Sequence, residues 1–252
     1  MKLLEVTDLR KSFGSLHALD GVTLGVEEKK VNILIGPNGS GKTTLINCVS
    51  GFYPPDSGRV KFKGEDITGR APYKVYGLGI SRTFQIPNLF NKLTVLENVL
   101  VAEKGNPGES FLRAFLKRTW ERQESDAIDH AMSLLELLGL SHQWNKQALN
   151  LSGGQMKLLE MARALMSGAE LLLLDEPISG VNPTLAHEIF GSILKLRDEL
   201  GVTFLIIEHR LDIALSYVDS VTAMALGKVV ASGIPERVMA DPNVIEAYLG
   251  AQ

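Results

Sequence analysis

The chain has 252 residues, of which 45% are hydrophobic and 22% charged, and its formal net charge at pH 7 is −3. This length and composition suit one large α/β core, with or without a smaller inserted domain, and argue against intrinsic disorder. Proteins that bind nucleic acid usually present a basic surface to the phosphates, so the negative net charge argues against a nucleic-acid partner.

The N-terminal residues do not have the pattern of a secretion signal. Acidic side chains occur within Met1–Asp8, where a signal peptide would carry its apolar segment. The longest apolar runs, 171–174 and 204–207, are far shorter than the ~20 residues needed to cross a bilayer. We therefore expect a cytoplasmic chain without a membrane span.

Two kinds of β pattern alternate with helical segments. A β-rich run at Val60–Lys63, after turn residues, predicts an antiparallel element near the N-terminus. Apolar runs at Val31–Ile35, Leu171–Leu174 and Thr203–Ile207 predict strands buried on both faces of a mostly parallel sheet. The fold class is therefore predicted to be α/β.

Helical spacing replaces the β-rich runs between about Leu89 and Lys157. The apolar residues of the clearest helix form one predicted stripe and are Ile128, Ala131, Met132, Leu135 and Leu138. We interpret this stretch as a separate helical subdomain.

Residues 36–43 read GPNGSGKT and match the phosphate-binding loop at every fixed position. The loop follows the predicted strand Val31–Ile35 and precedes a helix predicted to begin near Lys42. Its N–H groups and the helix N-terminus attract phosphate, Lys42 reaches the β- and γ-phosphates, and Thr43 is a predicted Mg²⁺ ligand. A glycine-rich turn without a ligand is the alternative, which the complete pattern disfavours. The predicted ATP-binding residues of this segment are Gly36, Pro37, Asn38, Gly39, Ser40, Gly41, Lys42, Thr43 and Thr44.

Asp175 and Glu176 come directly after the apolar run Leu171–Leu174. Carboxylates at the end of a parallel strand lie where ligands gather in open α/β sheets. Asp175, predicted as the first residue after the strand, is suited to hold Mg²⁺ through water. Glu176 is suited to accept a proton from an attacking water molecule. A solvated acidic turn is the alternative, which the phosphate loop in the same chain disfavours.

The pentapeptide LSGGQ at Leu151–Gln155 precedes the acidic strand. With the phosphate loop and the acidic pair, it makes the whole chain resemble the ATP-binding subunit of an ATP-binding cassette (ABC) transporter. The resemblance implies a P-loop, RecA-like α/β core over 1–88 and 158–252, with an N-terminal antiparallel β subdomain and a helical subdomain over 89–157 that carries the pentapeptide. It also implies a second ATP-binding subunit, identical or related, paired head to tail. The resemblance implies that Ser152 and Gly154 of one subunit contact the γ-phosphate held by Lys42 of the other. The implied nucleotide-binding residues of this segment are Ser152, Gly153, Gly154 and Gln155.

Three further positions match the family one at a time. Phe13 resembles the aromatic residue that stacks on adenine, although by itself it would be assigned to the core. Gln85 resembles the glutamine that reaches the metal and the attacking water. His209 follows the strand Thr203–Ile207 and resembles the histidine that contacts the γ-phosphate. The resemblance thus implies catalytic roles for Gln85, Glu176 and His209, with Thr43, Gln85 and Asp175 at the metal.

A narrower resemblance points to importers of branched-chain amino acids. It rests on Arg82–Gln85, Leu93–Asn98, the ending Val244–Gly250, and Asn182 where many relatives carry aspartate. It implies transport through separate membrane subunits, with this chain at the cytoplasmic face of the membrane. A lipopolysaccharide-export ATPase and a soluble cassette protein remain alternatives, because residues that touch ATP do not identify the cargo. The apolar residues around Leu89 and Phe90 either receive a helix of a membrane subunit or pack under the helical subdomain.

Overall fold

The computed structural model describes residues 1–83, 87–104 and 121–249. The chain forms two compact units, one made of Met1–Gln85 with Glu170–Gln252 and the other of Ile86–Ala169. The first is an α/β unit and the second is helical, and each is described by itself. The predicted functional division at 88/89 and 157/158 stays a prediction, and its second boundary would fall within the helix α6 (Gly153–Met166).

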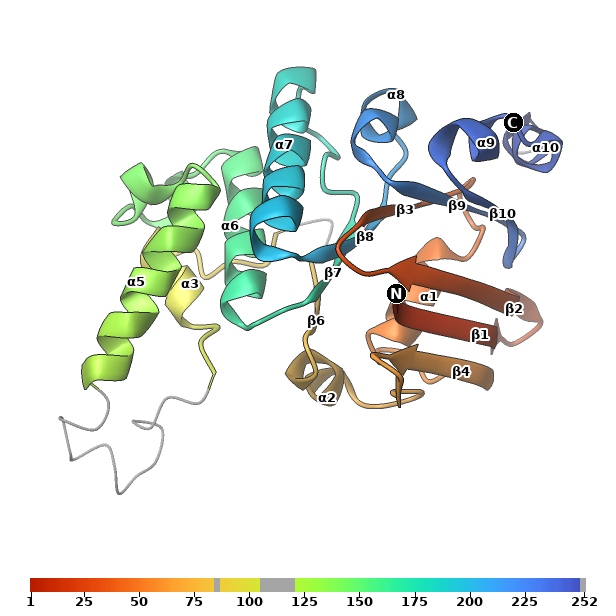
Figure 1. The fold of residues 1–252 in the computed structure, drawn as a ribbon, viewed down its shortest axis with the longest axis horizontal. Helices are drawn as coiled ribbons and strands as arrows, with labels where there is room; N and C mark the ends of the chain where they lie inside the picture. Colours follow the sequence, from red (N-terminus) through yellow and green to blue (C-terminus); the bar gives the residue numbers. More distant parts are fainter. Residues whose placement is uncertain (84–86, 105–120, 250–252) are drawn as a thin grey trace. The chain divides into compact units, whose positions relative to one another are not determined.

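An antiparallel sheet with strand order β2-β1-β4-β5 opens the α/β unit (Figure 1). Its strands are β1 (Lys2–Phe13), β2 (Leu16–Glu27), β4 (Ser57–Phe62) and β5 (Glu65–Asp66). The long hairpin β1–β2 turns at Gly14, whose φ of 60° lies in the left-handed region that favours glycine. The antiparallel element predicted near Val60–Lys63 is confirmed as β4, and β1 and β2 extend it toward the N-terminus.

A six-stranded sheet forms the centre of the α/β unit, with order β10-β9-β3-β8-β7-β6. Every neighbouring pair from β9 to β6 is parallel, and β10 is antiparallel to β9. The strands are β3 (Val31–Ile35), β6 (Ile80–Arg82), β7 (Leu171–Asp175), β8 (Thr203–Ile207), β9 (Ser220–Ala225) and β10 (Lys228–Gly233). The strands predicted at 31–35 and 203–207 are confirmed, and all residues of both are buried. Asp175 is the last residue of β7, which corrects its prediction as the first residue after the strand.

Alternate side chains of the parallel sheet enter different layers. Leu34, Leu173 and Leu205 join a core that also contains side chains of β1, β2, β4 and α1 (Lys42–Val49). This places α1 between the two sheets, and Figure 1 shows α7 (Pro183–Leu200) on the opposite side of the parallel sheet. Because both faces are covered, the strands read as continuous apolar runs. The other helices of this unit are α2 (Pro72–Gly77), α8 (Leu211–Ala214), the 3₁₀ turn η5 (Leu215–Tyr217), α9 (Pro235–Met239) and α10 (Pro242–Leu249).

The helical unit packs α3 (Val95–Leu100), α5 (Glu121–Leu137) and α6 against one another. Two 3₁₀ turns, η3 (Ser141–Gln143) and η4 (Ala148–Asn150), connect α5 to α6. The stripe predicted on α5 is partly wrong, because Ile128 is 37% exposed whereas Ala127 and Leu134 are buried. Ala131, Leu135 and Leu138 are buried as predicted, so the buried face keeps these three residues and includes Ala127 and Leu134 rather than Ile128. Within the described part of the chain, no helix has the length and apolar character required to span a membrane.

Candidate functional site

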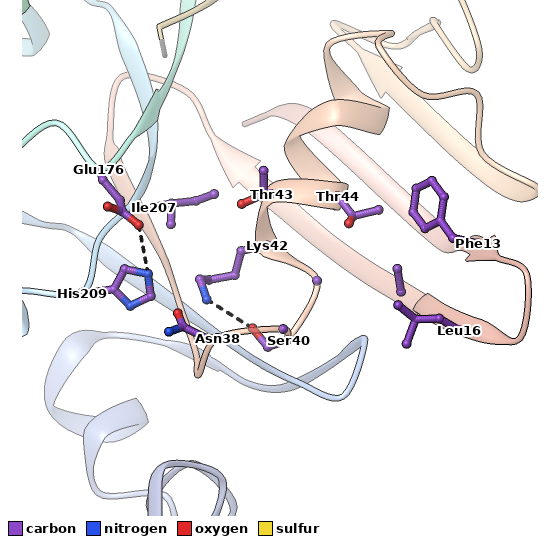
Figure 2. Close-up of a pocket in the computed structure, with 13 residues that line it drawn as sticks. Phe13, Leu16, Asn38, Ser40, Lys42, Thr43, Thr44, Glu176, Ile207 and His209 are labelled. Carbon is purple, nitrogen blue, oxygen red and sulfur yellow. Dashed lines mark hydrogen bonds and ion pairs between the residues drawn. The ribbon is translucent and has the colours of Figure 1, made fainter. Parts of the chain in front are cut away.

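A cavity of about 300 Å³ lies at the carboxyl ends of β3, β7 and β8. Figure 2 shows Lys42, Glu176 and His209 around one part of it and Phe13 at the other. Parallel strands of an open sheet collect their following loops at this edge, so residues far apart in sequence meet here. The lining residues are Phe13, Leu16, Ala18, Asn38, Gly39, Ser40, Gly41, Lys42, Thr43, Thr44, Glu176, Ile207 and His209. Leu16, Ala18 and Ile207 were not predicted, because apolar strand residues carry no motif.

Lys42 begins α1, as predicted, and its ammonium group turns back onto the loop before it. Its Nζ donates hydrogen bonds to the carbonyl oxygens of Gly36 at 2.8 Å and Pro37 at 2.9 Å, and to Ser40 Oγ at 3.3 Å. The side chain is 6% exposed, and burial lowers the pKa of Lys42, although the charges of Glu176 and Asp175 oppose that shift. A buried ammonium beside a helix N-terminus is a strong attractor for an anion.

Gly36 is required by close packing against the next strand of the sheet. Its φ is 147°, and a Cβ atom on it would lie 2.1 Å from the carbonyl oxygen of Met224 in β9. Any side chain would therefore push the start of the phosphate loop away from β9. Gly36 and Pro37 do not line the cavity themselves, and they act on it by accepting hydrogen bonds from Lys42.

Glu176 and His209 meet across the ends of two neighbouring strands. His209 Nε2 lies 3.3 Å from Glu176 Oε1, and both side chains are partly exposed to the cavity (Figure 2). Glu176 has a φ of 51°, a left-handed conformation that costs a residue with a side chain ~1–2 kcal/mol. Its N–H donates to the carbonyl oxygen of Ile207 at 2.9 Å, which holds it in place. Strain of this kind at a strand end is typical of a functional position.

Asp175 forms an ion pair with Arg82, which the sequence did not predict. Arg82 Nη2 donates to Asp175 Oδ2 at 3.1 Å, and the side chains of Arg82 and Asp175 are only 9% and 13% exposed. Arg82 also donates to Asn47 Oδ1 of α1. The guanidinium therefore joins the ends of β6 and β7 to the helix that follows the phosphate loop. Asp175 is not among the residues that line the cavity.

Phe13 ends β1 and lines the cavity away from the acidic pair. It is 45% exposed rather than buried in the core, and Lys11 Nζ lies 5.5 Å from its ring centroid. Tyr53 forms a T-shaped contact with it, with 5.4 Å between the ring centroids and an interplanar angle of 74°. Phe13 is therefore a partly exposed aromatic ring at the cavity, of the kind that can pack against a flat ligand.

The LSGGQ residues belong to the helical unit and form the start of α6. Ser152 is the N-cap, and the two hydrogen bonds of a capping box join it to Gln155. The Gln155 N–H donates to Ser152 Oγ at 3.3 Å, and the Ser152 N–H donates to Gln155 Oε1 at 3.0 Å. Gly153 is exposed and Gly154 is buried.

Gln85, predicted at the metal and at the attacking water, lies outside the described residues. Among residues 1–83, 87–104 and 121–249, no group of three His, Cys, Asp or Glu side chains could hold a metal ion. Thr43 lines the cavity, and Asp175 lies at the adjoining strand end.

A family model described as ABC transporter matches residues 19–179, which include the phosphate loop, LSGGQ and the acidic pair. This chain belongs to the ABC transporter family. The resemblance based on LSGGQ is thereby confirmed. A second model, described as branched-chain amino acid ATP-binding cassette transporter, matches residues 228–252 of this ABC cassette.

Curated relatives match the ABC cassette along its whole length. A probable branched-chain amino acid transport ATP-binding protein LivG from Archaeoglobus fulgidus is 50% identical over 252 residues, covering 100% of this chain and 97% of the relative. The high-affinity branched-chain amino acid transport ATP-binding protein LivG of Escherichia coli K12 is 38% identical over 249 residues, covering 98% of each chain.

Solved ABC cassettes share the fold. A nucleotide-free ATP-binding cassette from an ABC transporter superposes with a TM-score of 0.84 at 46% identity, covering 98% of this chain and 99% of that one. The ADP conformation of an ABC transporter cassette gives a TM-score of 0.85 at 45% identity, covering 99% of both. The predicted P-loop α/β fold is confirmed, and this ABC cassette is a nucleotide-binding chain.

Proposed function

We propose that this chain binds ATP with Mg²⁺ in the cavity beside Lys42 and hydrolyses it to drive import of branched-chain amino acids through separate membrane subunits. The observation that carries the proposal is the meeting of three groups at one cavity: Lys42 of the phosphate loop, and Glu176 and His209 at two strand ends. ABC family membership and relatives named for branched-chain amino acid transport support it.

ATP is oriented along the cavity by its two ends. Adenine stacks on the exposed ring of Phe13, and the phosphates lie over the N–H groups of 38–44 at the start of α1. Lys42 exchanges its loop carbonyl partners for the β- and γ-phosphate oxygens. Because the ammonium is already buried, an anion gains more from it than it would from a solvated lysine.

Hydrolysis uses the two groups at the strand ends. The oxygen of a water molecule attacks the γ-phosphorus while a proton of that water passes to the Glu176 carboxylate. The bond between the γ-phosphorus and its bridging oxygen breaks, and the electron pair stays on the β-phosphate of ADP. His209, 3.3 Å from Glu176, contacts the γ-phosphate and keeps the carboxylate directed toward the water.

The donors near the phosphate loop fit Mg²⁺ rather than a softer metal. Thr43 offers a hydroxyl oxygen and Asp175 a carboxylate, and Mg²⁺ prefers oxygen donors with water and phosphate completing its shell. When bound with ATP, Mg²⁺ supplies charge neutralisation of the phosphates. Arg82 donates a hydrogen bond to one oxygen of Asp175, which leaves the other carboxylate oxygen for the metal or its water. Gln85 remains a predicted third contact.

A second ATP-binding subunit supplies the signature residues. Ser152 and the N-terminus of α6 form an exposed, capped helix start with a hydroxyl that can donate to a phosphate oxygen. In a head-to-tail pair, Ser152, Gly153, Gly154 and Gln155 of one subunit would close over the γ-phosphate on Lys42 of the other. ATP would then hold the two subunits together.

We also propose that membrane subunits bind the helical unit near Phe90. This interaction would place the chain at the cytoplasmic face of the membrane. Phe90 is 50% exposed, and Arg163 of α6 lies over its ring at 5.6 Å. Asn98, which is fully buried, accepts a hydrogen bond from the Phe90 N–H at 2.9 Å and donates one to its carbonyl oxygen at 3.1 Å. An exposed aromatic ring on a fixed backbone is a typical anchor for a partner.

Two substitutions test the nucleotide chemistry. Lys42→Ala should weaken ATP binding in calorimetry, because it removes the ammonium group that we place at the phosphates. Glu176→Gln should keep ATP binding while slowing hydrolysis by about 10² to 10⁴, the range for loss of a general base. With ATP, but not with ADP, the Glu176→Gln chain should also elute as a dimer. Wild-type binding in the first variant, or wild-type turnover in the second, would refute these assignments.

The cargo and the membrane partner need a separate experiment. Cysteine at the exposed positions Asn88 or Asn91, beside Phe90, should crosslink to a membrane subunit in native membranes. Cysteine at Glu236 in α9, exposed but remote in sequence, serves as the control. The crosslinked complex should couple ATP hydrolysis to leucine uptake in vesicles. A partner from a lipopolysaccharide exporter, or equal crosslinking at all three positions, would overturn the assignment.

A further inference from the structure

The segments that carry Glu176 and His209 are joined by a buried carboxylate that no motif includes. Glu208 directly follows β8 and is 2% exposed. Its Oε1 accepts the Ile178 N–H at 2.9 Å, and its Oε2 accepts the N–H groups of His209 at 3.0 Å and Arg210 at 3.3 Å. One side chain thus bonds to the backbone of both segments.

The two oxygens of Glu208 divide between the two segments. Oε1 faces the loop that follows β7, two residues beyond Glu176, and Oε2 closes the turn that contains His209. Two other contacts run alongside: the Glu176 N–H donates to the Ile207 carbonyl oxygen at 2.9 Å, and Arg210 Nη1 donates to the Val181 carbonyl oxygen at 3.2 Å. Glu208 lies between these two contacts in sequence, so three neighbouring contacts join the two segments beside the cavity.

We propose that Glu208 is a positioning residue that fixes Glu176 and His209 relative to each other for hydrolysis. The inference rests on the proposed ATP hydrolysis at this site. A carboxylate suits the task because it has acceptors on both oxygens and no hydrogen to place against an N–H group. Glutamine has the same shape but one amide NH₂, so it can serve only one of the two segments and must face the other with a donor.

A purely structural role of Glu208 predicts different results from a positioning role. If Glu208 only satisfied buried N–H groups, its loss would lower stability and act on every property of the site together. A positioning role acts on the transition state through His209, because displacement of a reacting group by ~1 Å can cost about 10²-fold in rate. The two roles are separated by comparing kcat with ATP affinity, and by repeating the substitution where His209 is already absent.

The experiment uses the 252-residue chain with ATP and Mg²⁺. Glu208→Gln should lower kcat by about 10- to 10²-fold while calorimetric ATP affinity is unchanged. In a His209→Ala background, the same substitution should lower kcat much less, because the group that it positions is missing. Hydrogen exchange should accelerate at the N–H groups of Ile178, His209 or Arg210 and not in the interior of β8. Glu236→Gln, an exposed carboxylate in α9, should keep wild-type kcat.

Several results would overturn the proposal. These are a wild-type kcat in Glu208→Gln, an equal loss of kcat with and without His209, or a parallel loss of ATP affinity. If Glu208→Gln does not fold, Glu208→Asp, which keeps both oxygens on a shorter chain, is tested by the same criteria. A wild-type chain that binds but does not hydrolyse ATP would refute the proposed function instead, and the exchange measurement would still decide whether Glu208 joins the two segments.

Discussion

The phosphate loop of the α/β unit and the LSGGQ segment of the helical unit are both glycine-containing helix starts, but they are held in opposite ways. The loop at 36–43 depends on distant parts of the chain, since Gly36 packs against the Met224 carbonyl and the Gly227 N–H donates to the Ser40 carbonyl at 3.1 Å. The LSGGQ segment is held by hydrogen bonds between residues three apart, Ser152 and Gln155.

This difference follows from what each segment must do in the proposed mechanism. A loop that surrounds a phosphate from one chain must keep a fixed distance to Glu176 and His209, so it is built into the sheet. A segment that meets the phosphate of another subunit needs only its own helix start in order. A substitution in the phosphate loop should therefore disturb structure throughout the α/β unit. A substitution in LSGGQ should disturb only the start of α6.

The largest loss of stability should come from the ion pair at the sheet end. Arg82→Met leaves the Asp175 carboxylate, only 13% exposed, without its guanidinium, and should lower the free energy of unfolding by about 3 kcal/mol. Urea unfolding followed by circular dichroism measures it. Arg10→Met, which breaks the exposed pairs with Asp8 and Asp20, is the control and should have a much smaller effect. Equal losses would show that burial of the pair is unimportant.

Two glycines of the phosphate loop test its dependence on tertiary contact. Gly36→Ala places a Cβ 2.1 Å from the Met224 carbonyl oxygen and should cost about 2 to 3 kcal/mol, with loss of ATP binding. Gly39→Ala has φ at 77° but nothing within 4 Å of the new Cβ, so it should cost only about 1 kcal/mol. Thermal unfolding and nucleotide titration of both variants check this ranking. A reversed ranking would mean that backbone conformation, not packing on β9, limits the loop.

Removing the cap of α6 should cause a smaller loss of stability, confined to the start of that helix. Ser152→Ala removes the acceptor of the Gln155 N–H and should cost about 1 kcal/mol. Hydrogen exchange should accelerate in the first turn of α6 and stay unchanged in β3. Ser152→Asp keeps an acceptor but adds a negative charge, so it should restore the cap and still prevent the ATP-dependent dimer. Faster exchange in β3 after Ser152→Ala would contradict the local picture.

Much of the α/β unit could be predicted from sequence because apolar runs buried on both faces leave little choice of structure. Val31–Ile35 and Thr203–Ile207 were located to the residue in this way. The phosphate loop and LSGGQ were found because their spacing is rarely produced by anything else. The roles assigned to individual site residues remain predictions, although the cavity lies where the motifs indicated.

The missed features depend on partners far away in sequence. Arg82 pairs with Asp175 across 93 positions, and Glu208 bonds to Ile178 across 30, so neither role could be read from neighbouring residues. On α5, which packs against α3 and α6, Ala127 is buried and Ile128 is 37% exposed, although the spacing of apolar residues predicted Ile128 on the buried face. Local pattern decides which segment is a helix, but packing decides which face is buried.

Substitution of Asn182 should have the smallest effect on stability. It tests whether a helix cap within the α/β unit depends on neighbouring residues alone, as the cap of α6 does. Asn182 Oδ1 accepts the Leu185 N–H at 2.9 Å as the N-cap of α7, with Pro183 in the first turn. Aspartate caps a helix as well as asparagine does, so Asn182→Asp should change stability by less than about 0.5 kcal/mol, whereas Asn182→Ala should cost about 1 kcal/mol. Asparagine and aspartate at position 182 would then be structurally equivalent. Urea unfolding of the three proteins measures the ranking, and a large loss in Asn182→Asp would mean that the added charge, not the cap, dominates at this loop.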